Sequence, residues 1–597
     1  MYSQAINTYR EQIAKYKLLL KEQKKQHQIW SMIRLFGFLA LVALIILAFN
    51  THYGLGIFAI YLAAFVFVKI MKRHEKISKL KDKSTSIIQT NEDEITFLNN
   101  LNSFRDKGEP YKDNAHPYSS DLDIFGENSL FQYIERTCTR YGRDKLAQRL
   151  TTPLLKEDIL VNQEAVSELT SKLDWRQGFM AYDLKKKDDA LDKTALLKWK
   201  ETAPALIENR SIGIVRIVLP FIALTVFIIL CYYIPWYLAL FAFLPSILLQ
   251  RKYADHISQL LSLSEHSLKY ISSYGPLIEE IENGSFTSDR LRDLQAYFLK
   301  GNKTSKKLKS LDWYLEQIAV KHNIFGAIFN VVSLYDIHFT IRVEQWQAEN
   351  KEDIDVWTDA LAEFEFLQSL ANLSYNNKQW TFPIIEGDVI DCVNIGHPLI
   401  AGDKRIANTI SLPVHQHIKL ITGSNMGGKS TFQRTIGMNM VLSYCGSKVC
   451  ASKLHLPILK VLSSMRTQDD LSKDASGFYA ELLRLKMVLE KVQTSENNYF
   501  FIDEILKGTN TDDRHKGSKA LIKQLLRSNG AGLISTHDLE LAKLEDTLNG
   551  QLENICFEVD VIDEKLFFDY TVKKGVSKSF NATKLMESIG IDISDES

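Results

Sequence analysis

The chain has 597 residues, a length that gives room for about three or four domains, each with its own hydrophobic core. Hydrophobic residues make up 45% and charged residues 24% of the chain, ordinary globular proportions that argue against a disordered protein. Because 72 Lys and Arg balance 72 Asp and Glu, the net charge is zero, and overall charge gives no support to nucleic-acid binding.

The cysteines show no pattern typical of a disulfide framework or a metal site. They form no C-x-x-C pair and have no zinc-ligand spacing, so we expect reduced, mostly buried thiols. They are Cys138, Cys231, Cys392, Cys445, Cys450 and Cys556. The largely polar residues that follow Met1 predict no cleavable signal peptide.

The chain opens with a basic segment and a long apolar run. Residues 1–34 predict a basic amphipathic helix, for which attraction to anionic lipid and a plain solvated face both stay open. Residues 35–68 contain no Asp, Glu, Lys or Arg; the run is too long for one span and suits two short helices with a turn near residues 50–54. We therefore predict a transmembrane hairpin over residues 35–70, and a cytosolic helix with a polar linker over 71–120.

A second uncharged run lies at residues 217–250, with Pro235 as its turn candidate. Basic residues flank the outer ends of both runs and none lies at their tips, which predicts four transmembrane helices as two hairpins with the termini in the cytosol. This pattern indicates a multi-pass protein of the cell (inner) membrane with cytoplasmic domains. The alternative is a pair of buried helical hairpins in a soluble core.

The rest of the chain divides by its periodicity. Residues 121–380 show apolar residues at helical spacing, which predicts an all-α domain that the second hairpin interrupts at about 212–250. Residues 381–597 alternate strand and helix patterns, which predicts a C-terminal α/β domain. The predicted fold class is thus multidomain, with an all-α core, two transmembrane hairpins and a C-terminal α/β domain.

A glycine loop in this domain fits the pattern G-x-x-x-x-G-K-[ST] between a strand and a helix. Such a loop surrounds phosphates with backbone N–H groups, while its Lys reaches the β- and γ-phosphates and its Ser holds Mg²⁺. We therefore predict a P-loop that binds ATP and Mg²⁺. Its residues are Gly423, Ser424, Asn425, Met426, Gly427, Gly428, Lys429, Ser430 and Thr431.

Two further strands deliver candidate catalytic side chains. The strand "NYFFIDE" ends in Asp503 and Glu504, the first a predicted metal ligand and the second a candidate for polarising the attacking water. The strand "AGLIST" leads to His537, which we predict contacts the γ-phosphate or orders the water. Together these residues predict an enzyme that hydrolyses ATP.

Four segments carry a resemblance to a known family: "TGSNMGGKST", "RTQDDLSKDASGFYAELLRL", "FFIDEILKGTNTDDR" and "STHDLEL". Their order and spacing resemble the ABC-type ATPase domain of the MutS family of DNA mismatch-repair proteins. Residues 121–154 resemble the opening of that family's helical core and lever domain. The resemblance implies an ATP-dependent DNA-binding clamp. It also implies that Ser476 contacts the ATP of the opposite subunit, and hence a homodimer.

The chain also departs from that family. Its first 120 residues leave no room for the mismatch-recognition and connector domains, so the resemblance points to a membrane-anchored branch without them. Arg405 stands where an adenine-stacking aromatic residue is expected, and no nuclease-like tail follows the α/β domain.

The partner of the helical region stays open between two interpretations. A lysine-rich segment is a candidate for non-specific contact with DNA phosphates, although a solvated surface explains it equally well. The other interpretation is a membrane-tethered, nucleotide-switched scaffold that acts on a protein partner without binding DNA. The candidate lysines are Lys300, Lys303, Lys306, Lys307 and Lys309.

Overall fold

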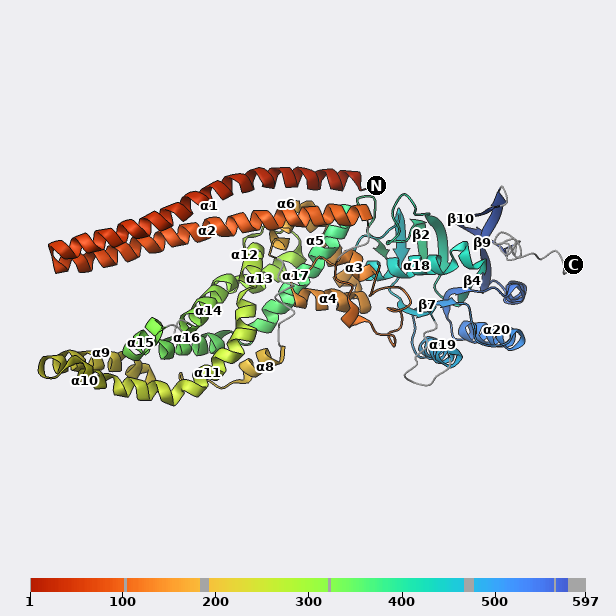
Figure 1. Cartoon of the computed structure of the whole chain (residues 1–597). Helices are drawn as coiled ribbons and strands as arrows, with labels where there is room; N and C mark the ends of the chain where they lie inside the picture. Colours follow the sequence, from red (N-terminus) through yellow and green to blue (C-terminus); the bar gives the residue numbers. More distant parts are fainter. Residues whose placement is uncertain are drawn as a thin grey trace, which may run out of the picture. The chain divides into compact units, whose positions relative to one another are not determined.

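A computed structural model describes residues 2–100, 105–182, 193–319, 324–466, 477–562 and 565–577. The chain forms two compact units. Unit 1 comprises Met1–Arg136, Asp144–Leu173 and Phe366–Ser597, and unit 2 comprises Thr137–Arg143 and Asp174–Glu365. The described residues are mostly helical, and an α/β domain lies towards the C-terminus, as the sequence predicts (Figure 1).

Unit 1 opens with two long antiparallel helices, α1 (Ser3–Thr51) and α2 (Tyr53–Asn100). His52 between them is extended, and its Nδ1 accepts a hydrogen bond from the Gly54 N–H at 3.0 Å, so the chain turns within the predicted segment 50–54. At about 1.5 Å per residue each helix is roughly 70 Å long. The basic N-terminal segment and the first apolar limb form one continuous helix, because no proline or helix cap separates them.

The base of this hairpin is fixed by buried polar contacts within unit 1. The buried Glu94 carboxylate accepts hydrogen bonds from Arg105 Nη2 at 2.7 Å, Arg136 Nε at 2.5 Å and Asn376 Nδ2 at 3.1 Å. Tyr9 Oη of α1 donates to Asn376 Oδ1 at 2.7 Å. Both helices are therefore anchored to the same residue of the unit 1 core.

The α/β domain is built on a six-stranded sheet of order β10-β9-β4-β8-β7-β6, parallel except for the antiparallel pair β9–β10. Its strands are β4 (His417–Gly423), β6 (Lys460–Ser464), β7 (Asn498–Asp503), β8 (Ala531–Ser535), β9 (Leu552–Ile562) and β10 (Lys565–Lys574). Ile421 pairs with Ser535, and Ser535 with Asp503, so the carboxyl ends of three neighbouring strands meet at one edge. Ligands of open α/β sheets bind at such an edge.

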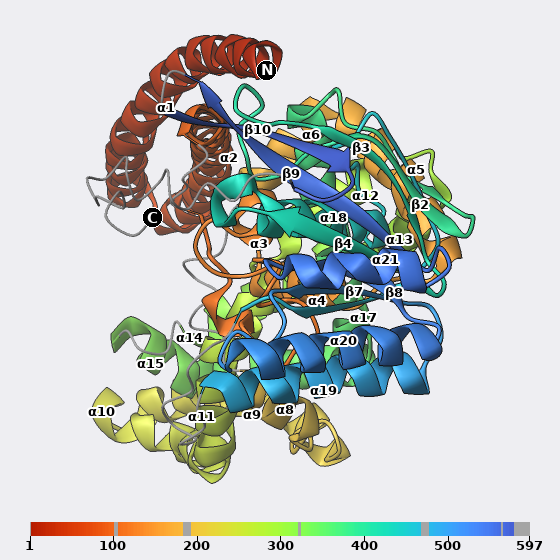
Figure 2. The same cartoon turned by 90° about the vertical axis from the view of Figure 1, so that its right-hand side faces the viewer.

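Helices cover this sheet, and a smaller sheet adjoins the domain. Leu485 of α19 and Ile522 of α20 pack with Ile418 of β4 in one apolar core, and both helices lie along the same face of the sheet (Figure 2). The helices are α18 (Lys429–Tyr444), α19 (Gly477–Thr494), α20 (Thr511–Arg527) and α21 (Leu544–Thr547), with 3₁₀ turns η4 (Asn425–Gly427) and η5 (Leu539–Lys543). The four-stranded sheet has the order β1-β5-β2-β3, from β1 (Ile384–Ile385), β2 (Val389–Ile395), β3 (Asn408–Pro413) and β5 (Lys453–Leu456).

The remaining elements are helical. Unit 1 holds η1 (Glu109–Tyr111), α3 (Leu130–Ile134) and α5 (Lys156–Ser171), and both units share α4 (Arg140–Thr151), α6 (Leu173–Met180) and α17 (Asp353–Asn376). Unit 2 contains α8 (Lys193–Glu201), α9 (Arg210–Tyr233), α10 (Trp236–Ala239), η2 (Leu240–Phe243), α11 (Leu244–Ser272), α12 (Gly275–Asn283), α13 (Asp289–Leu299), α14 (Thr304–Ala319), α15 (Ile324–Ser333) and α16 (Tyr335–Asn350).

Three helices among the described residues, rather than the predicted four, are long and apolar enough to cross a membrane: Ser3–Thr51, Tyr53–Asn99 and Ser211–Tyr233. The chain does turn at Pro235, but the returning limb is broken into α10, η2 and the start of α11. Only 0%, 17% and 6% of the apolar windows of the three helices are buried. The alternative of two hairpins buried in a soluble core is therefore not supported.

Candidate functional site

The glycine loop follows β4 and ends where α18 begins. Gly423 has φ +140°, and a Cβ there would lie 2.6 Å from the Phe557 carbonyl oxygen, so only glycine fits between β4 and β9. Gly428 has φ +94° and directly precedes Lys429, the first residue of α18. The loop thus brings the free N–H groups of a helix N-terminus to the carboxyl edge of the sheet, an arrangement that attracts anions.

Lys429 lies inside this loop. Its Nζ donates to the carbonyl oxygens of Gly423 at 2.8 Å and Ser424 at 2.9 Å, and lies 3.2 Å from His537 Nε2. Burial lowers the pKa of Lys429 to about 8, although the carboxylates of Glu504 and Asp503 partly offset it. Its ammonium group is therefore held where a phosphate above the loop would meet it.

Asp503 connects the loop to two strands. Its carboxylate accepts hydrogen bonds from Ser430 Oγ at 2.5 Å and from Ser535 Oγ. Among the described residues no group of three or more His, Cys, Asp or Glu side chains forms a metal site. One carboxylate and one hydroxyl side by side nevertheless suit Mg²⁺, which takes few protein ligands and completes its shell with waters and phosphate oxygens.

Glu504 follows β7 in a left-handed backbone conformation with φ +52°. Its Oε1 lies 3.0 Å from His537 Nε2 and its Oε2 lies 3.3 Å from Lys507 Nζ. The hydrogen bond to His537, together with the charge of Lys507, lowers the pKa of Glu504 to about 2 despite its partial burial. The carboxylate is therefore ionised at neutral pH, and the unusual backbone turns it towards the loop rather than along the strand.

A cavity of about 500 Å³ opens beside the loop, and most of its lining was not identified in the sequence. Met426, Gly428 and Thr431 of the loop and its helix line it together with Tyr570 of β10. Asn408 holds Tyr570 by donating to its carbonyl oxygen at 3.1 Å and accepting from the Val572 N–H at 2.8 Å. Tyr570 belongs to the aromatic segment "FFDY", which lies far from the loop in the chain.

Arg405 does not replace an aromatic residue in this cavity. Its Nε and Nη2 donate to the Ile400 carbonyl oxygen at 3.0 and 2.6 Å, and its guanidinium lies 5.6 Å from the Trp380 ring centre. These contacts hold the Arg405 side chain against its own loop.

Comparison with known proteins agrees with this geometry. Residues 419–592 match the family model of MutS domain V. The chain is 30% identical over 223 residues to the DNA mismatch repair protein MutS of Bacillus licheniformis, covering 36% of this chain and 25% of the relative. It is 28% identical over 299 residues to that of Ehrlichia ruminantium, with coverages of 49% and 33%, and 31% identical over 238 residues to that of Aquifex pyrophilus, with coverages of 39% and 26%.

The chain belongs to the MutS family. It spans only about a quarter to a third of the length of these curated relatives. The matched part of the chain contains the glycine loop, Asp503, Glu504 and His537. Ser476 and the Asn425 side chain lie outside the described residues.

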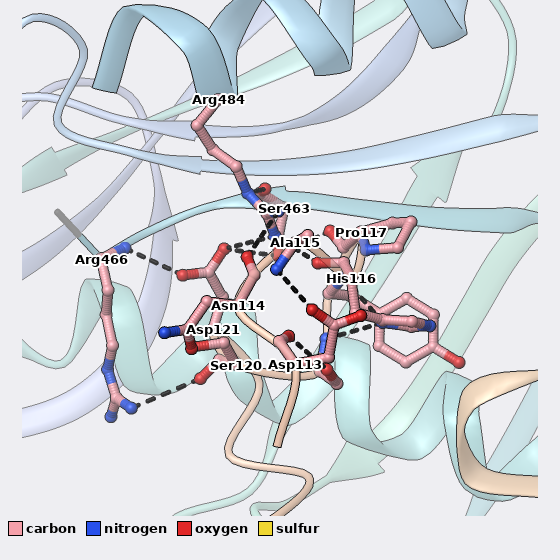
Figure 3. A network of polar contacts seen from close by, with 12 residues as sticks. Asp113, Asn114, Ala115, His116, Pro117, Ser120, Asp121, Ser463, Arg466 and Arg484 are labelled. Atoms are coloured by element: carbon pink, nitrogen blue, oxygen red, sulfur yellow. Dashed lines mark hydrogen bonds and ion pairs between the residues drawn. The ribbon is translucent and has the colours of Figure 1, made fainter. Parts of the chain in front are cut away.

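A polar network connects elements of the domain V region to the segment at residues 113–123 (Figure 3). Asp121 accepts hydrogen bonds from Ser463 Oγ at 2.7 Å, the Arg466 N–H at 3.0 Å and Arg484 Nη2 at 3.3 Å. Asp123 pairs with Arg466 at 2.7 Å and with Arg434 of α18 at 3.4 Å. The sequence predicts a helical region from Asp121 onwards; residues 113–123 form a loop that contacts α18, α19 and the end of β6, and helix α3 begins at Leu130.

The candidate DNA-contact lysines lie in unit 2, and several have local partners. Lys309 pairs with Glu279 at 2.7 Å, Lys307 lies 3.8 Å from Asp353, and Lys303 donates to Asn283 Oδ1 at 2.9 Å. Part of their positive charge is therefore neutralised within the helical unit.

Proposed function

We propose that the chain is a membrane-anchored, Mg²⁺-dependent ATPase of the MutS family that acts as an ATP-dependent clamp on DNA. The observation that carries this proposal is the convergence of Lys429, Ser430, Asp503, Glu504 and His537 at the carboxyl edge of the six-stranded sheet. They come from the ends of the two strands β7 and β8 and from the N-terminus of α18, and each has the chemistry that nucleotide hydrolysis needs.

Each of these residues has a separate role in the proposed binding and hydrolysis of ATP. Loop N–H groups and the Lys429 ammonium bind the phosphates, and the Ser424 Oγ, which is buried without a hydrogen-bond partner, is a further candidate donor. Ser430 and Asp503 hold Mg²⁺, which neutralises charge on the phosphates. Glu504 orients and polarises the attacking water, and His537, already in contact with both Lys429 and Glu504, positions that carboxylate and senses the γ-phosphate.

The cavity beside the loop is the proposed site of the adenine base. It is lined by apolar atoms of Met426, Phe432 and Phe557 and by Tyr570, which replaces the missing aromatic residue at Arg405. Tyr570 already stacks on Phe568 with ring centres 5.9 Å apart, so its ring is oriented before a base arrives.

The family resemblance extends the proposal to a homodimer in which Ser476 of one copy contacts the ATP of the other. In this scheme the nucleotide-binding domain is 381–597 and the helical core and lever domain is 121–380. ATP binding brings two such domains together and hydrolysis releases them, so the helical arms are moved by the nucleotide state.

Membrane anchoring is proposed from the apolar surfaces. Leu44 and Phe58 of the first hairpin and Phe221 and Trp236 of the second are 45%, 64%, 68% and 66% exposed. Exposed apolar area of this extent is typical of lipid contact. With basic residues at the outer ends of both runs, the proposed location is the inner membrane, with the ATPase domain and the helical domain in the cytoplasm.

DNA is the proposed partner because the relatives are described as DNA mismatch repair proteins. A nucleotide-switched scaffold for a protein partner is the second candidate, favoured by the local neutralisation of Lys307 and Lys309.

The decisive test is ATP turnover by the purified full-length chain in detergent with and without Mg²⁺. We expect Lys429→Ala to reduce turnover at least about a hundredfold, because it removes the buried cation that faces the phosphates. Lys453→Ala, at a surface lysine 3.8 Å from Asp391, is the matched control and should leave turnover unchanged. Normal turnover by Lys429→Ala would refute the assignment of the site.

A further inference from the structure

The first hairpin has a strongly basic section between its apolar tip and its base. We call this section the stalk and define it as residues 15–34 of α1 and 69–83 of α2. It carries thirteen Lys and Arg against three Asp and Glu, a net charge of +10 in a chain whose total is zero. The basic residues are Lys15, Lys17, Lys21, Lys24, Lys25, Arg34, Lys69, Lys72, Arg73, Lys76, Lys79, Lys81 and Lys83.

These charges are arranged in rows rather than scattered. On α2, Lys72, Lys76, Lys79 and Lys83 follow one another at intervals of four, three and four residues, so they share one face of the helix. At about 1.5 Å per residue this row places one charge roughly every 5–6 Å over about 16 Å. A row of regularly spaced cations is complementary to a polymer with regularly spaced anions.

A second row lies on α1 and lines a groove. Lys17, Lys21 and Lys24 have the same spacing and face a groove of about 520 Å³ between α1 and α2, with Leu20 and Ile88 among its apolar lining. Glu92 lies in the same groove and pairs with Lys17 at 3.2 Å. Within the part of the chain that the structure describes, Lys21 and Lys24 make no ion pair and both are exposed.

The membrane accounts for only part of this charge. Arg34, Lys69, Lys72 and Arg73 lie within about one turn of the apolar run, where basic residues set the orientation of membrane segments. Residues 15–25 of α1 lie about 15–30 Å further along the helix, at roughly 1.5 Å per residue. Electrostatic attraction to lipid headgroups is screened over about 8 Å in physiological salt, so on an upright stalk the headgroups are too far away to attract these lysines.

We propose that the stalk binds the phosphate backbone of duplex nucleic acid without reading its sequence. Lysines contact phosphates as point charges and release counterions, which gives affinity without base specificity. The inference rests on the proposed function for the identity of the partner, and it adds a contact surface on α1 and α2. Three stalk lysines have acidic partners, Lys17 with Glu92, Lys79 with Glu75 and Lys81 with Asp82, but the stalk still carries ten more basic than acidic residues.

The test uses the full-length chain in nanodiscs of zwitterionic lipid and a fluorescein-labelled duplex of random sequence. Anisotropy titrations between about 50 and 200 mM salt measure affinity and the slope of log K against log salt. The test variant, called the stalk Gln variant, combines four substitutions at exposed side chains: Lys21→Gln, Lys24→Gln, Lys25→Gln and Lys76→Gln. If all four contact phosphates, we expect the slope to fall by about three to four units and affinity to fall at least about tenfold.

Matched variants show whether DNA affinity depends on where the lysines lie or only on how many positive charges the chain carries. Replacing the same four lysines by Arg should retain the wild-type slope, which shows that the helices are intact. Changing Lys300, Lys303, Lys306 and Lys309 to Gln should leave most of the binding. An unchanged slope for the stalk Gln variant overturns the inference. A second arm repeats the titration with membranes that contain anionic phosphatidylserine, and a loss of DNA affinity seen only in those membranes also overturns the inference.

ATP turnover is measured on every sample, so that the two proposals fail separately. A wild-type chain that hydrolyses ATP but shows no salt-dependent DNA affinity overturns the stalk inference and leaves the ATPase assignment standing. A chain that binds DNA through the stalk without hydrolysing ATP overturns the proposed enzyme instead. We expect the stalk variant to keep wild-type turnover, because none of its residues belongs to the nucleotide loop.

Discussion

The amino-acid sequence determines the structure of the C-terminal α/β domain and that of the two apolar hairpins in different ways. In the α/β domain single side chains are fixed by contacts: Lys429 by two carbonyl oxygens, and Asp503 by two serine hydroxyls. In the apolar hairpin tips, exposed Leu, Ile, Phe and Val side chains make few specific contacts, and any apolar residue serves the same purpose. The first region thus depends on residue identity, and the second on composition.

The largest expected effect lies at the base of the first hairpin, where side chains are fixed by specific contacts as they are in the α/β domain. Glu94→Gln removes the buried carboxylate that forms ion pairs with both Arg105 and Arg136. We expect the free energy of unfolding to fall by about 3–5 kcal/mol. Chemical denaturation in detergent, followed by tryptophan fluorescence, measures this change.

The control for Glu94→Gln is Glu92→Gln, two residues away in α2, at an exposed carboxylate that pairs with Lys17. It should change the free energy of unfolding by less than about 0.5 kcal/mol. Equal effects of the two substitutions on the free energy of unfolding would show that the buried ion pairs of Glu94 do not stabilise the base of the hairpin.

The next effect tests residue identity inside the α/β domain. Glu504→Gln keeps the shape of the side chain but removes the charge that polarises water, so turnover should fall about a hundred- to a thousandfold. ATP binding should persist, because Lys429, Ser430 and Asp503 are unchanged. Glu540→Gln, at an exposed carboxylate paired with Lys543, should leave turnover as it is. Normal hydrolysis by Glu504→Gln would remove this residue from the proposed mechanism.

A third prediction tests the dependence of the hairpins on composition. Leu44 lies within the apolar run of α1 and is 45% exposed. Leu44→Arg should oppose membrane insertion by about 2.5–3.5 kcal/mol, whereas Leu44→Ile should have almost no effect. The fraction of chain that resists carbonate extraction from membranes measures insertion. Equal extraction of both variants would contradict lipid contact at this position.

The smallest effect concerns pH. Because burial lowers the pKa of Lys429 to about 8, a rise in pH through this value removes the ammonium charge from the nucleotide-free loop. Affinity for ATP should therefore be constant below about pH 7 and fall by at most about tenfold per unit above pH 8. Calorimetric titration with a non-hydrolysable ATP analogue checks this dependence, and an affinity that rises with pH would contradict it.

The sequence correctly predicted the elements that carry a phosphate-binding motif or a run of apolar residues typical of a buried strand. The strands β4, β7 and β8 and the helix α18 lie where the motif and the apolar runs placed them. The convergence of Asp503, Glu504 and His537 also follows from the sequence, because strand ends of a parallel sheet meet at one edge.

Other features depended on contacts between distant segments and were missed. The break after Pro235 was not visible in a uniformly apolar run, since helix and turn residues there have similar composition. Asp121 lies in a loop because Ser463, Arg466 and Arg484 supply its partners from about 340 residues away or more. Tyr570 reaches the cavity only because β10 folds back along β9.

The unbroken course of α1 and α2 has a consequence for how copies of the chain meet. From Tyr9 at the base to Leu35 at the apolar run, the helix covers about 40 Å at roughly 1.5 Å per residue. If the hairpin is anchored in a membrane as proposed, a rigid spacer of this kind would hold the base of each copy at a fixed height above the bilayer. Neighbours in the same lipid sheet would then search for each other in two dimensions, at a raised local concentration.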